Sequence, residues 1–588
     1  MLVYAGVVIG LGCMRLSTAA DRDDARSLEV LAAAFAAGVD LVDTADAYAH
    51  DDADIGHNER LVAQAIAATG AAVQVVTKGG LVRPGGAWVP DGRARHLAAA
   101  ARASRERLGR TIDLYLLHAI DPRTAFATSV RALARLRADG VVREVGISNI
   151  NATQLAEALA ITTIAAVEVE LNPWKLDAMR GGLVDACTRA GIRVLAHRPL
   201  GGPDGARRAA RDPVVAAIAE RTGATPQEVI LAWLRSLSPM IVPLPGATRP
   251  ETAASAARGQ ELVLDAAACS ELAAQFLEVR GAATVGSGDA GEVVMVMGMP
   301  AAGKSLHAES LVAQGYARLN RDERGGTLLE LARALDRELA AGTRRVVVDN
   351  TYGTRAQRAP VLAIARRHGL PVRCIVVAPP LEQAQAHAVA RILARHGRLL
   401  EPAELRGTAD IAPRVQFGYR RTYEPPHTDE GFATVTELVP PRATTGTRRA
   451  LVVELDDVVW RGRPRAPADI ALLPEAAAAL VAWSQHALAA TVWRPGATAG
   501  ELAALAARLR ELLGGALAID VVACTHPAGP PICWCRKPLP GLALALARTH
   551  DLDLAASVHL GRGPADRGFA VRAGMRYAAI SDGWPRPE

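Results

Sequence analysis

A complete phosphate-binding motif lies at residues 298–305 of the 588-residue chain, where GMPAAGKS fits the pattern G-x-x-x-x-G-K-[ST]. In such a loop, backbone N–H groups surround the phosphates, a lysine reaches the β- and γ-phosphates, and a hydroxyl ligates Mg²⁺. An apolar run at 293–297 predicts the strand before the loop, and an amphipathic run at 306–315 predicts the helix after it. We therefore expect ATP with Mg²⁺ to bind here, held by Gly298, Gly303, Lys304 and Ser305.

The residues after this loop supply what phosphoryl transfer needs besides a phosphate cradle, namely a positioned acceptor and a cation over the migrating group. Asp322, in the segment NRDER, could act as the base for an acceptor hydroxyl. An arginine-bearing helix predicted at 386–398 could close over the phosphates. Asp349 ends an apolar strand and has two readings, a partner of Mg²⁺ or a contact to the acceptor. Asn350 and Arg358 accompany it.

Four polar residues near the start of the chain could reduce a carbonyl group. Asp43, Lys78 and His118 each end a strand-like apolar run. Tyr48 lies in the loop after the first of these runs. A phenol with a pKa of about 10 is a poor acid at neutral pH. A lysine ammonium held by Asp43 would stabilise the phenolate and bring the pKa of Tyr48 toward the useful range, while His118 could orient the substrate oxygen.

Three cysteines and a histidine form the pattern C-x-H-x₆-C-x-C, comprising Cys524, His526, Cys533 and Cys535. Two tight pairs joined by a short loop can place three thiolates and an imidazole tetrahedrally around Zn²⁺. A cluster of free thiols is the alternative. Seven cysteines in a chain of this length do not make a disulfide framework, and such a grouping is typical of metal ligands in a reducing cytosol. We expect structural zinc and a cytoplasmic protein.

The segments that carry these residues share one pattern of secondary structure. Short apolar runs alternate with longer amphipathic stretches, which favours parallel α/β architecture throughout. Small polar stretches at 281–291 and 440–449 indicate linkers between domains at 1–280, 292–439 and 450–588. Eight strand-like runs in the first domain fit a (β/α)8 TIM barrel, whose catalytic residues lie at the carboxyl ends of the strands.

Composition excludes some classes of protein. Half of the residues are hydrophobic and 22% are charged, which is an ordinary globular composition. No apolar run approaches the roughly 18–20 residues of a membrane-spanning helix, and the first residues lack the basic segment of a signal peptide. A net charge of +6 permits a polyanionic partner without arguing for one. We therefore expect no membrane partner.

Residues 1–280 resemble the aldo-keto reductases, because the four carbonyl-reducing candidates match the catalytic tetrad of that family. The segments GISN, HRPLGG and PGATRPET resemble its cofactor-binding motifs. The resemblance implies hydride transfer from NADPH to a small aldehyde or ketone without a metal. Glu168 and His197 stand where the family usually has a glutamine and a tyrosine. The implied NADP(H) contacts are Ser148, Asn149, Glu168, His197, Leu200, Gly246, Thr248 and Arg249, the last two favouring NADPH over NADH.

Residues 292–438 resemble the kinase module of polynucleotide kinases through GMPAAGKS, NRD, VVDNT and EPPHTDEGF. The resemblance implies that Asp322 is the general base for a 5′-hydroxyl and that Arg391 is the lid arginine. It also implies RNA or DNA 5′-hydroxyl ends as partners besides ATP. Small-molecule kinases share the same plan, so a sugar or another alcohol remains an alternative acceptor.

Residues 450–588 resemble the zinc-loop phosphatases of the haloacid dehalogenase superfamily, specifically the heptose-bisphosphate and histidinol-phosphate group. The resemblance implies a Rossmann-like α/β fold. The family's nucleophilic aspartate is replaced by Glu454, although Asp456 and Lys537 are kept. Arg562 replaces an acid that should hold Mg²⁺. A displaced nucleophile slows catalysis strongly. We expect a weak or inactive phosphatase that serves as a zinc-stabilised scaffold or end-binding module.

The combined expectation is a bifunctional enzyme with NADPH-dependent carbonyl reductase activity and ATP-dependent 5′-hydroxyl polynucleotide kinase activity, serving nucleic-acid repair. One alternative is a carbonyl reductase fused to a small-molecule kinase. Another is a barrel that acts as an NADP(H) sensor for a repair kinase.

Overall fold

The computed structural model describes most of the chain. The described residues are 10–202, 204–259, 262–277, 291–406, 408, 410–442, 446–515, 517–529 and 532–587. The first expected linker therefore lies outside the described residues except for Gly291, and the second is described in part. Contacts divide the chain into two compact units, Met1–Ala282 with Thr354–Val361 and Ala283–Gly353 with Leu362–Glu588. The domain boundaries expected from the sequence stay predictions.

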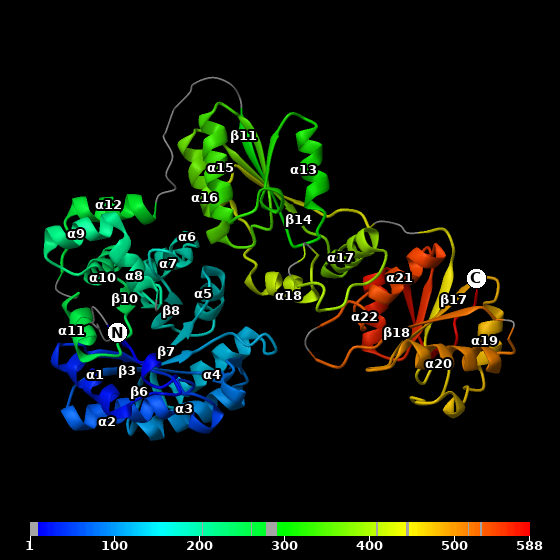
Figure 1. The fold of residues 1–588 in the computed structure, drawn as a ribbon, viewed down its shortest axis with the longest axis horizontal. Helices are drawn as coiled ribbons and strands as arrows, with labels where there is room; N and C mark the ends of the chain where they lie inside the picture. The colour runs from blue at the N-terminus through cyan, green and yellow to red at the C-terminus, as the bar shows by residue number, and fades with distance from the viewer. Residues whose placement is uncertain are drawn as a thin grey trace. The chain divides into compact units, whose positions relative to one another are not determined.

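Eight parallel strands form the large sheet of the first unit and follow their order in the chain (Figure 1). They are β1 (Leu11–Gly12), β2 (Leu41–Asp43), β3 (Gln74–Gly79), β6 (Ile112–Leu117), β7 (Val142–Ser148), β8 (Ala166–Glu170), β9 (Arg193–His197) and β10 (Ile241–Leu244). The two edges meet because the N–H of Gly10 donates to the carbonyl of Pro243 at 2.9 Å. A near-closed (β/α)8 barrel results, and it confirms the expected fold of this segment.

Helices connect the strands and cover the outside of the barrel. They include α1 (Asp24–Ala36), α2 (His57–Thr69), α3 (Ala94–Leu108), α4 (Phe126–Ala138), α5 (Ala152–Leu159), α7 (Leu183–Ala190), α9 (Pro213–Thr222), α10 (Pro226–Ser236), α11 (Pro250–Arg258) and α12 (Ala266–Phe276). Branched side chains such as Leu116, Leu195 and Val242 fill the interior, as a packed barrel requires. This packing fixes the strand ends, where the polar residues lie.

Shorter elements decorate the loops of the barrel. A two-stranded antiparallel hairpin of β4 (Leu81–Val82) and β5 (Val89–Pro90) follows β3. The helices α6 (Asp177–Arg180) and α8 (Gly205–Arg211) lie in the loops after β8 and β9. These loops follow the carboxyl ends of the strands, where active sites of such barrels form.

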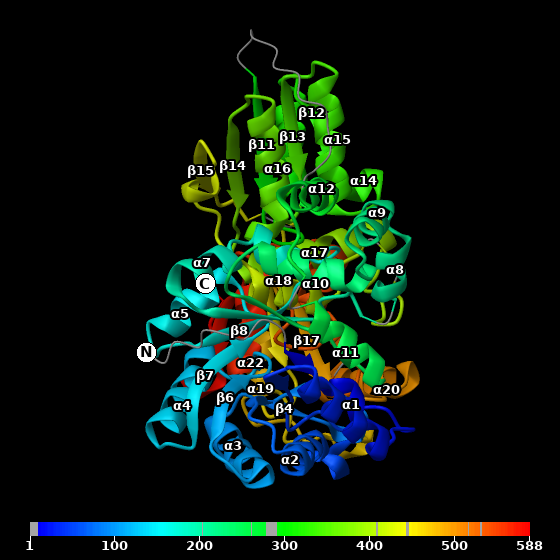
Figure 2. The same cartoon turned by 90° about the vertical axis from the view of Figure 1, so that its left-hand side faces the viewer.

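Five parallel strands form the sheet that carries the phosphate loop, in the order β12-β13-β11-β14-β15 (Figure 2). Their bounds are β11 (Glu292–Met297), β12 (Ala317–Asn320), β13 (Arg345–Asp349), β14 (Val372–Val377) and β15 (Thr434–Leu438). Strand β11 is central and buried from Val293 onward, because a parallel strand paired on both sides and covered on both faces must be apolar. The phosphate loop leaves its carboxyl end, where ligands bind in open α/β sheets.

Helices follow the strands of this sheet as α/β crossovers. They are α13 (Lys304–Val312), α14 (Arg321–Arg324), α15 (Leu328–Ala340), α16 (Arg355–Arg367), α17 (Leu381–His396) and α18 (Pro413–Thr422). We call residues 397–412, between α17 and α18, the anchor loop. Leu400 and Leu405 of the anchor loop are buried in one hydrophobic cluster with residues of the last part of the chain, among them Cys524 and Trp534.

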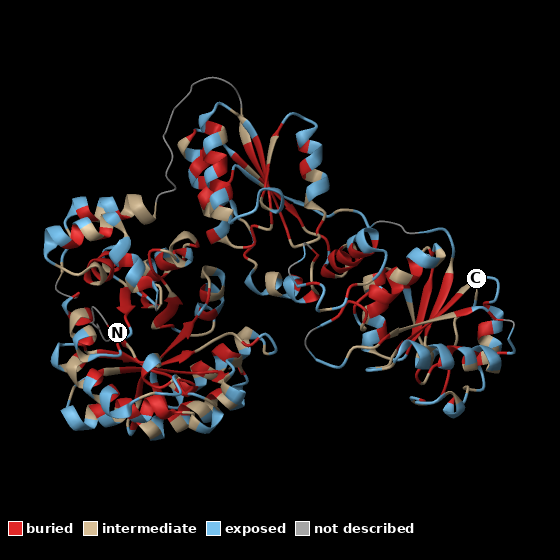
Figure 3. Ribbon diagram, in the orientation of Figure 1, coloured by how far each residue is buried: buried red, intermediate tan, exposed pale blue. Residues whose placement is uncertain are grey.

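A second five-stranded parallel sheet follows, in the order β18-β17-β16-β19-β20. Its strands are β16 (Ala450–Glu454), β17 (Ala487–Trp493), β18 (Ile519–Cys524), β19 (Val558–Gly561) and β20 (Arg576–Ala579), and its helices are α19 (Ala476–Ala482), α20 (Ala499–Leu512), α21 (Gly541–His550) and α22 (Pro564–Ala573). Figure 3 shows the central strands buried beneath helices. The expected parallel α/β architecture is therefore present here too. Among the described helices, none combines the length and apolarity needed to cross a bilayer.

Candidate functional sites

The four carbonyl-reducing candidates come together at the carboxyl ends of the barrel strands. The Lys78 ammonium donates to Asp43 Oδ1 at 2.5 Å and to the Tyr48 hydroxyl at 3.0 Å. His118 stands directly after β6, and its ring centroid lies 5.5 Å from that of Tyr48. Parallel strands in register bring residues distant in sequence to one rim, so the predicted grouping is what the structure shows.

The pKa of Tyr48 moves in the opposite direction to the expectation. Burial of the phenol raises its pKa, and the charge of Lys78 lowers it by less. The negative charge of Asp43 raises the pKa further, and Glu168 does the same when it is ionised. The expected net lowering is therefore wrong for this structure. The lysine charge is largely neutralised by Asp43, and the phenol is removed from water.

Aromatic rings surround the phenol and were not predicted. Trp88 is 44% exposed, and its ring centroid lies 6.4 Å from Tyr48 and 6.2 Å from His118. The Arg83 guanidinium lies 3.7 Å above the Trp88 ring and donates to the carbonyls of Ala49 and His50. Burial places the pKa of His118 well below its usual value, so its imidazole is neutral. Trp88 lies in a turn-rich segment after Lys78, where no periodic pattern predicts the position of a side chain.

Two buried polar atoms without partners mark the predicted nicotinamide position. Ser148 and Glu168 are paired across β7 and β8. The Ser148 Oγ atom and the Glu168 Oε2 atom make no hydrogen bond with described residues and are shielded from solvent. A carboxamide offers a donor and an acceptor, which suits two such atoms. Asn149 adopts φ 60° beside them and accepts from His197 at 3.3 Å, so these residues fit the amide end of NADP(H).

The remaining predicted cofactor residues lie in the loops after β9 and β10. Leu200 belongs to a loop that borders an open cavity of about 740 Å³. Residues lining that cavity include Trp174, Gly201, Arg207, Arg208 and Arg211. Gly246 pairs with Gly12, while Thr248 and Arg249 stand before the first turn of α11. Arginines beside a cavity and a helix N-terminus are both suited to bind phosphate groups. Arg207, Arg208 and Arg211 were not among the residues expected from the sequence.

The phosphate loop has the geometry that its sequence predicts. Gly298 and Gly303 have φ of 148° and 99°, which favour glycine. Lys304 and Ser305 open α13, and the Lys304 ammonium donates to the carbonyls of Gly298 and Met299 at 3.1 and 2.9 Å. Burial lowers the pKa of Lys304 to about 8, and Asp349 and Asp322 oppose this shift. The charges of Asp322 and Asp349 therefore act on Lys304 in the phosphate loop.

Asp349 is held by neighbours that the sequence did not single out. It is buried at the end of β13 and accepts from Arg318 at 2.6 Å and from Asn320 at 3.0 Å. The side chain of Asp322 is 79% exposed, so it is accessible to an acceptor. Asn350 is buried directly after β13. Arg358 lies in the first turn of α16 and is also buried.

Two helices hold the phosphate loop from outside. On α17, the His387 ring contacts the carbonyl of Ala301 at 3.2 Å. On α18, the Gln416 amide donates to the carbonyl of Pro300 at 2.9 Å. Arg391, one turn beyond His387, is exposed, and its charge acts on Lys304. This position is consistent with the predicted role of Arg391 over the phosphates.

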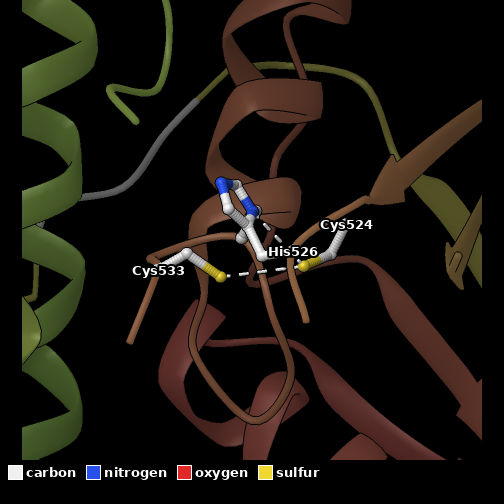
Figure 4. A group of neighbouring side chains, drawn as sticks. Cys524, His526 and Cys533 are labelled. Carbon is white, nitrogen blue, oxygen red and sulfur yellow. Dashed lines mark hydrogen bonds between the residues drawn. The ribbon is translucent and has the colours of Figure 1, made fainter. Parts of the chain in front are cut away.

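The three cysteines and the histidine of the predicted zinc motif converge. Figure 4 shows three of them, Cys524, His526 and Cys533. Their ligand atoms lie within 4.8 Å of one another. The His526 Nδ1 atom is 3.1 Å from Cys535 Sγ, and the sulfurs of Cys524 and Cys533 are 3.7 Å apart. Three sulfurs and one imidazole nitrogen are a donor set that fits tetrahedral Zn²⁺. The other ring nitrogen of His526 contacts Glu401 of the anchor loop at 2.5 Å.

Three acids near the carboxyl ends of β16 and β19 are paired with cations of the chain itself. Lys537 donates to Glu454 at 2.5 Å and to Asp566 at 2.6 Å. Arg494 holds Asp456 through two hydrogen bonds of 2.7 and 2.8 Å. A carboxylate paired with an internal arginine is poorly available to Mg²⁺.

Arg562 completes this pattern. Arg562 pairs with Asp457 at 2.5 Å, and its backbone N–H donates to Asp566 at 3.0 Å. Burial raises the pKa of Glu454, while Lys537 lowers it by less. No pair of unengaged carboxylates remains at this strand edge among the described residues.

Residues 8–275 match the model of the Aldo/keto reductase family, and residues 293–403 match the model of an AAA domain. The barrel is accordingly an aldo-keto reductase domain, and the segment after it is a P-loop kinase-like domain.

Solved structures similar to this chain include several aldo-keto reductases. A thermostable aldo-keto reductase in complex with epalrestat has 27% identity, covers 45% of this chain and 93% of its own, and gives a TM-score of 0.39. An aldo-keto reductase of Bombyx mori in complex with NADP has 24% identity, with coverage of 46% and 88% and a TM-score of 0.38. Aldose reductase from Giardia lamblia has 20% identity, with coverage of 46% and 92% and a TM-score of 0.39.

Proposed function

We propose that the barrel reduces the carbonyl group of a small aldehyde or ketone with NADPH. The observation that carries this proposal is the hydrogen-bonded series from Asp43 through Lys78 to Tyr48. NADPH, when bound, supplies a hydride to the carbonyl carbon. Tyr48 donates its phenolic proton to the carbonyl oxygen, and Lys78 stabilises the phenolate that remains. The neutral His118 orients that oxygen, and no metal takes part in the proposed reaction.

The choice of NADPH is supported by the predicted phosphate contacts. Thr248 and Arg249 stand before α11, where a helix N-terminus and a guanidinium would both favour a 2′-phosphate. NADPH and NADH oxidation should therefore be compared with a panel of aldehydes and ketones. Turnover with NADPH preferred over NADH supports the proposal. Equal use of both cofactors contradicts the assignment of Thr248 and Arg249.

The P-loop domain, we propose, transfers the γ-phosphoryl group of ATP to a hydroxyl, with a nucleic-acid 5′ end as the acceptor. The supporting observation is that Lys304 lies in the field of Asp322, Asp349 and Arg391. Asp322 would take the proton of the hydroxyl, while Lys304 and Arg391 neutralise charge on the migrating group. Asp349 would serve Mg²⁺ or the acceptor. DNA or RNA with a 5′-hydroxyl end would be the partner, as repair of broken strands requires.

Transfer of labelled γ-phosphate to 5′-hydroxyl oligonucleotides tests this assignment. We expect wild-type protein to label them, and Lys304→Ala and Asp322→Ala to abolish the labelling. Glu309→Ala, on the exposed side of α13, is the control and should retain it. Labelling of small alcohols alone would show that the domain is a small-molecule kinase.

The last part of the chain is proposed to be a zinc-stabilised haloacid dehalogenase-type domain without phosphatase activity. Its support is the pairing of Glu454, Asp456 and Asp566 with cations of the chain. Zn²⁺ would be held by Cys524, His526, Cys533 and Cys535. Such thiols stay free in a reducing compartment, so we propose a cytoplasmic location. One equivalent of zinc without Mg²⁺-dependent phosphate release is expected; hydrolysis lost on Glu454→Gln would contradict it.

A further inference from the structure

Lys78 lies between two buried carboxyl groups, and its hydrogen-bonding capacity is already used. Its ammonium donates to Asp43 at 2.5 Å, to the Tyr48 hydroxyl at 3.0 Å and to the carbonyl of Thr44 at 3.2 Å. An ammonium has three donors. The Glu168 Oε2 atom lies 3.3 Å from the same nitrogen but has no hydrogen bond among the described residues. Lys78 therefore has no donor left for a hydrogen bond to Glu168.

The carboxyl groups of Asp43 and Glu168 share the single ammonium of Lys78, at 2.5 and 3.3 Å from its nitrogen. Two carboxylates against one ammonium would leave a net negative charge in this cluster, and a proton on one of them removes it. Both residues are 3% exposed, which deprives a second negative charge of hydration. Asp43 makes the shorter contact with the ammonium of Lys78. The proton therefore belongs on Glu168.

We propose that Glu168 is a neutral carboxylic acid at neutral pH and that its ionisation sets an upper pH limit on carbonyl reduction in the barrel. This inference rests on the proposed reductase function. Glu168 is a positioning residue here, because it gives no proton to the substrate. Its neutral state keeps a negative charge away from the phenol of Tyr48, which is the proton donor. It also presents an uncharged hydrogen-bonding group beside the unpartnered Ser148 hydroxyl.

The direction of the effect follows from the charges. While Glu168 is neutral, Asp43 is the only negative side chain against Lys78 in this cluster. When Glu168 ionises, its charge raises the pKa of Tyr48 and makes the phenol a weaker proton donor. Burial raises the pKa of Glu168 to about 8. Reduction should therefore slow as the pH rises through this value.

Four of the other titratable groups around the site do not change charge in that interval. Burial lowers the pKa of His197 to about 4 and places that of His118 well below its usual value. Burial raises the pKa of the Cys13 thiol, and the two carboxyls keep that of Lys78 well above its usual value despite burial. Burial also raises the pKa of Asp46 well above its usual value. A transition near pH 8 is therefore assigned to Glu168 when it is lost in Glu168→Gln, and to Asp46 when it persists in that variant.

The protonation state can be measured without cofactor or substrate. Infrared difference spectra of full-length wild-type protein minus Glu168→Gln should show a protonated-carboxyl C=O band at about pH 6 that is lost by about pH 10. The control difference, wild type minus Glu144→Gln, removes an acid of β7 that pairs with Arg137 and should lack this band, because Glu168 is present in both proteins. Wild-type protein labelled with ¹³C at glutamate carboxyls gives the same titration if the variant does not fold. Carboxylate bands alone at every pH would overturn the proposal.

The kinetic consequence is tested with the same variants. The kcat/KM of wild-type protein for carbonyl reduction should fall about tenfold per pH unit above about pH 8, as loss of one proton requires. In Glu168→Gln the fall should begin at least about one unit higher, and Glu144→Gln should follow wild type. Coinciding wild-type and Glu168→Gln profiles would overturn the pH limit. Absence of any wild-type turnover would overturn the reductase function itself, while the infrared titration still decides the protonation state.

Discussion

The Nε2 atom of His526 lies 2.5 Å from a carboxylate oxygen of Glu401. His526 belongs to the cysteine–histidine cluster, whereas Glu401 belongs to the anchor loop between α17 and α18. Trp534 strengthens this junction, since its indole donates to the carbonyl of Ile411 at 2.8 Å. Helices α17 and α18 in turn contact the phosphate loop. A metal in the cluster would therefore stabilise a segment that packs on the nucleotide site.

Removal of zinc should loosen the anchor loop. The metal would fix the His526 ring, and that ring holds Glu401, so the loop loses one attachment when the cluster opens. Amide hydrogen exchange of residues 397–412 should accelerate at least about tenfold after chelation. Residues 328–340 form α15, a separate helix of the same unit, and serve as the internal reference. Equal acceleration in both segments would mean that chelation unfolds the whole unit.

The carboxylate of Glu401 should also strengthen metal binding. A carboxylate that accepts from a ligating histidine fixes the ring and raises its basicity, and loss of such a partner typically weakens affinity about 10–100-fold. We expect Glu401→Gln to weaken zinc affinity about tenfold in a chelator competition. Glu404→Gln is the control, because it removes the same charge from the same loop, but Glu404 pairs with Arg398 and not with His526. An equal loss in both variants would attribute the effect to net charge.

A methyl group at position 298 should abolish nucleotide binding. The Cβ of Gly298→Ala would lie 2.2 Å from the carbonyl oxygen of Val377, at a φ of 148°. The loop must then move, and its N–H groups no longer converge on the phosphates. We expect an ATP affinity at least about a hundredfold weaker by titration calorimetry. Gly500→Ala, in α20, places a Cβ no closer than 4.0 Å to any atom at a position without a positive φ, so it keeps the loop intact and should bind ATP normally.

The stability of the last part of the chain should depend on His559. This residue is fully buried, and burial lowers its pKa to about 4 from an ordinary value of about 6.5. The unfolded chain therefore binds a proton that the folded chain does not, so stability is lost as the pH falls from about 6.5 to about 4. The loss is on the order of 3 kcal/mol. Urea unfolding followed through the buried Trp460 and Trp483 should show it, and His559→Gln should flatten it.

The grouping of the four carbonyl-reducing candidates could be predicted because it depends on strand ends. Asp43, Lys78 and His118 lie at or just after the carboxyl ends of strands. Once the barrel fold is recognised, the parallel pairing of these strands places the three residues on one rim. The ionisation of Glu168 could not be predicted in this way. It depends on a 3.3 Å approach to Lys78 and on loss of water, which are properties of the packed barrel. Trp88 was missed because its position depends on the conformation of a turn-rich loop.

The phosphate loop and the metal motif were predictable because the residues of each lie close together in sequence. The side chains that contact Asp349 and His526 from other elements were not predictable. Arg318 meets Asp349 across adjacent strands, and Glu401 meets His526 from 125 residues away. Such contacts depend on how separate elements pack, and one sequence without its structure does not show which charged side chains meet.

The reductase claim is tested most directly by a single-turnover measurement of NADPH oxidation with an excess of aldehyde, comparing wild type with Tyr48→Phe. The phenylalanine keeps the ring beside Trp88 and His118 but removes the proton that Lys78 prepares for transfer. We predict a rate at least about a hundredfold lower in the variant, with an unchanged affinity for NADPH. Equal rates in the two proteins would contradict the assignment of the barrel as a tyrosine-dependent carbonyl reductase.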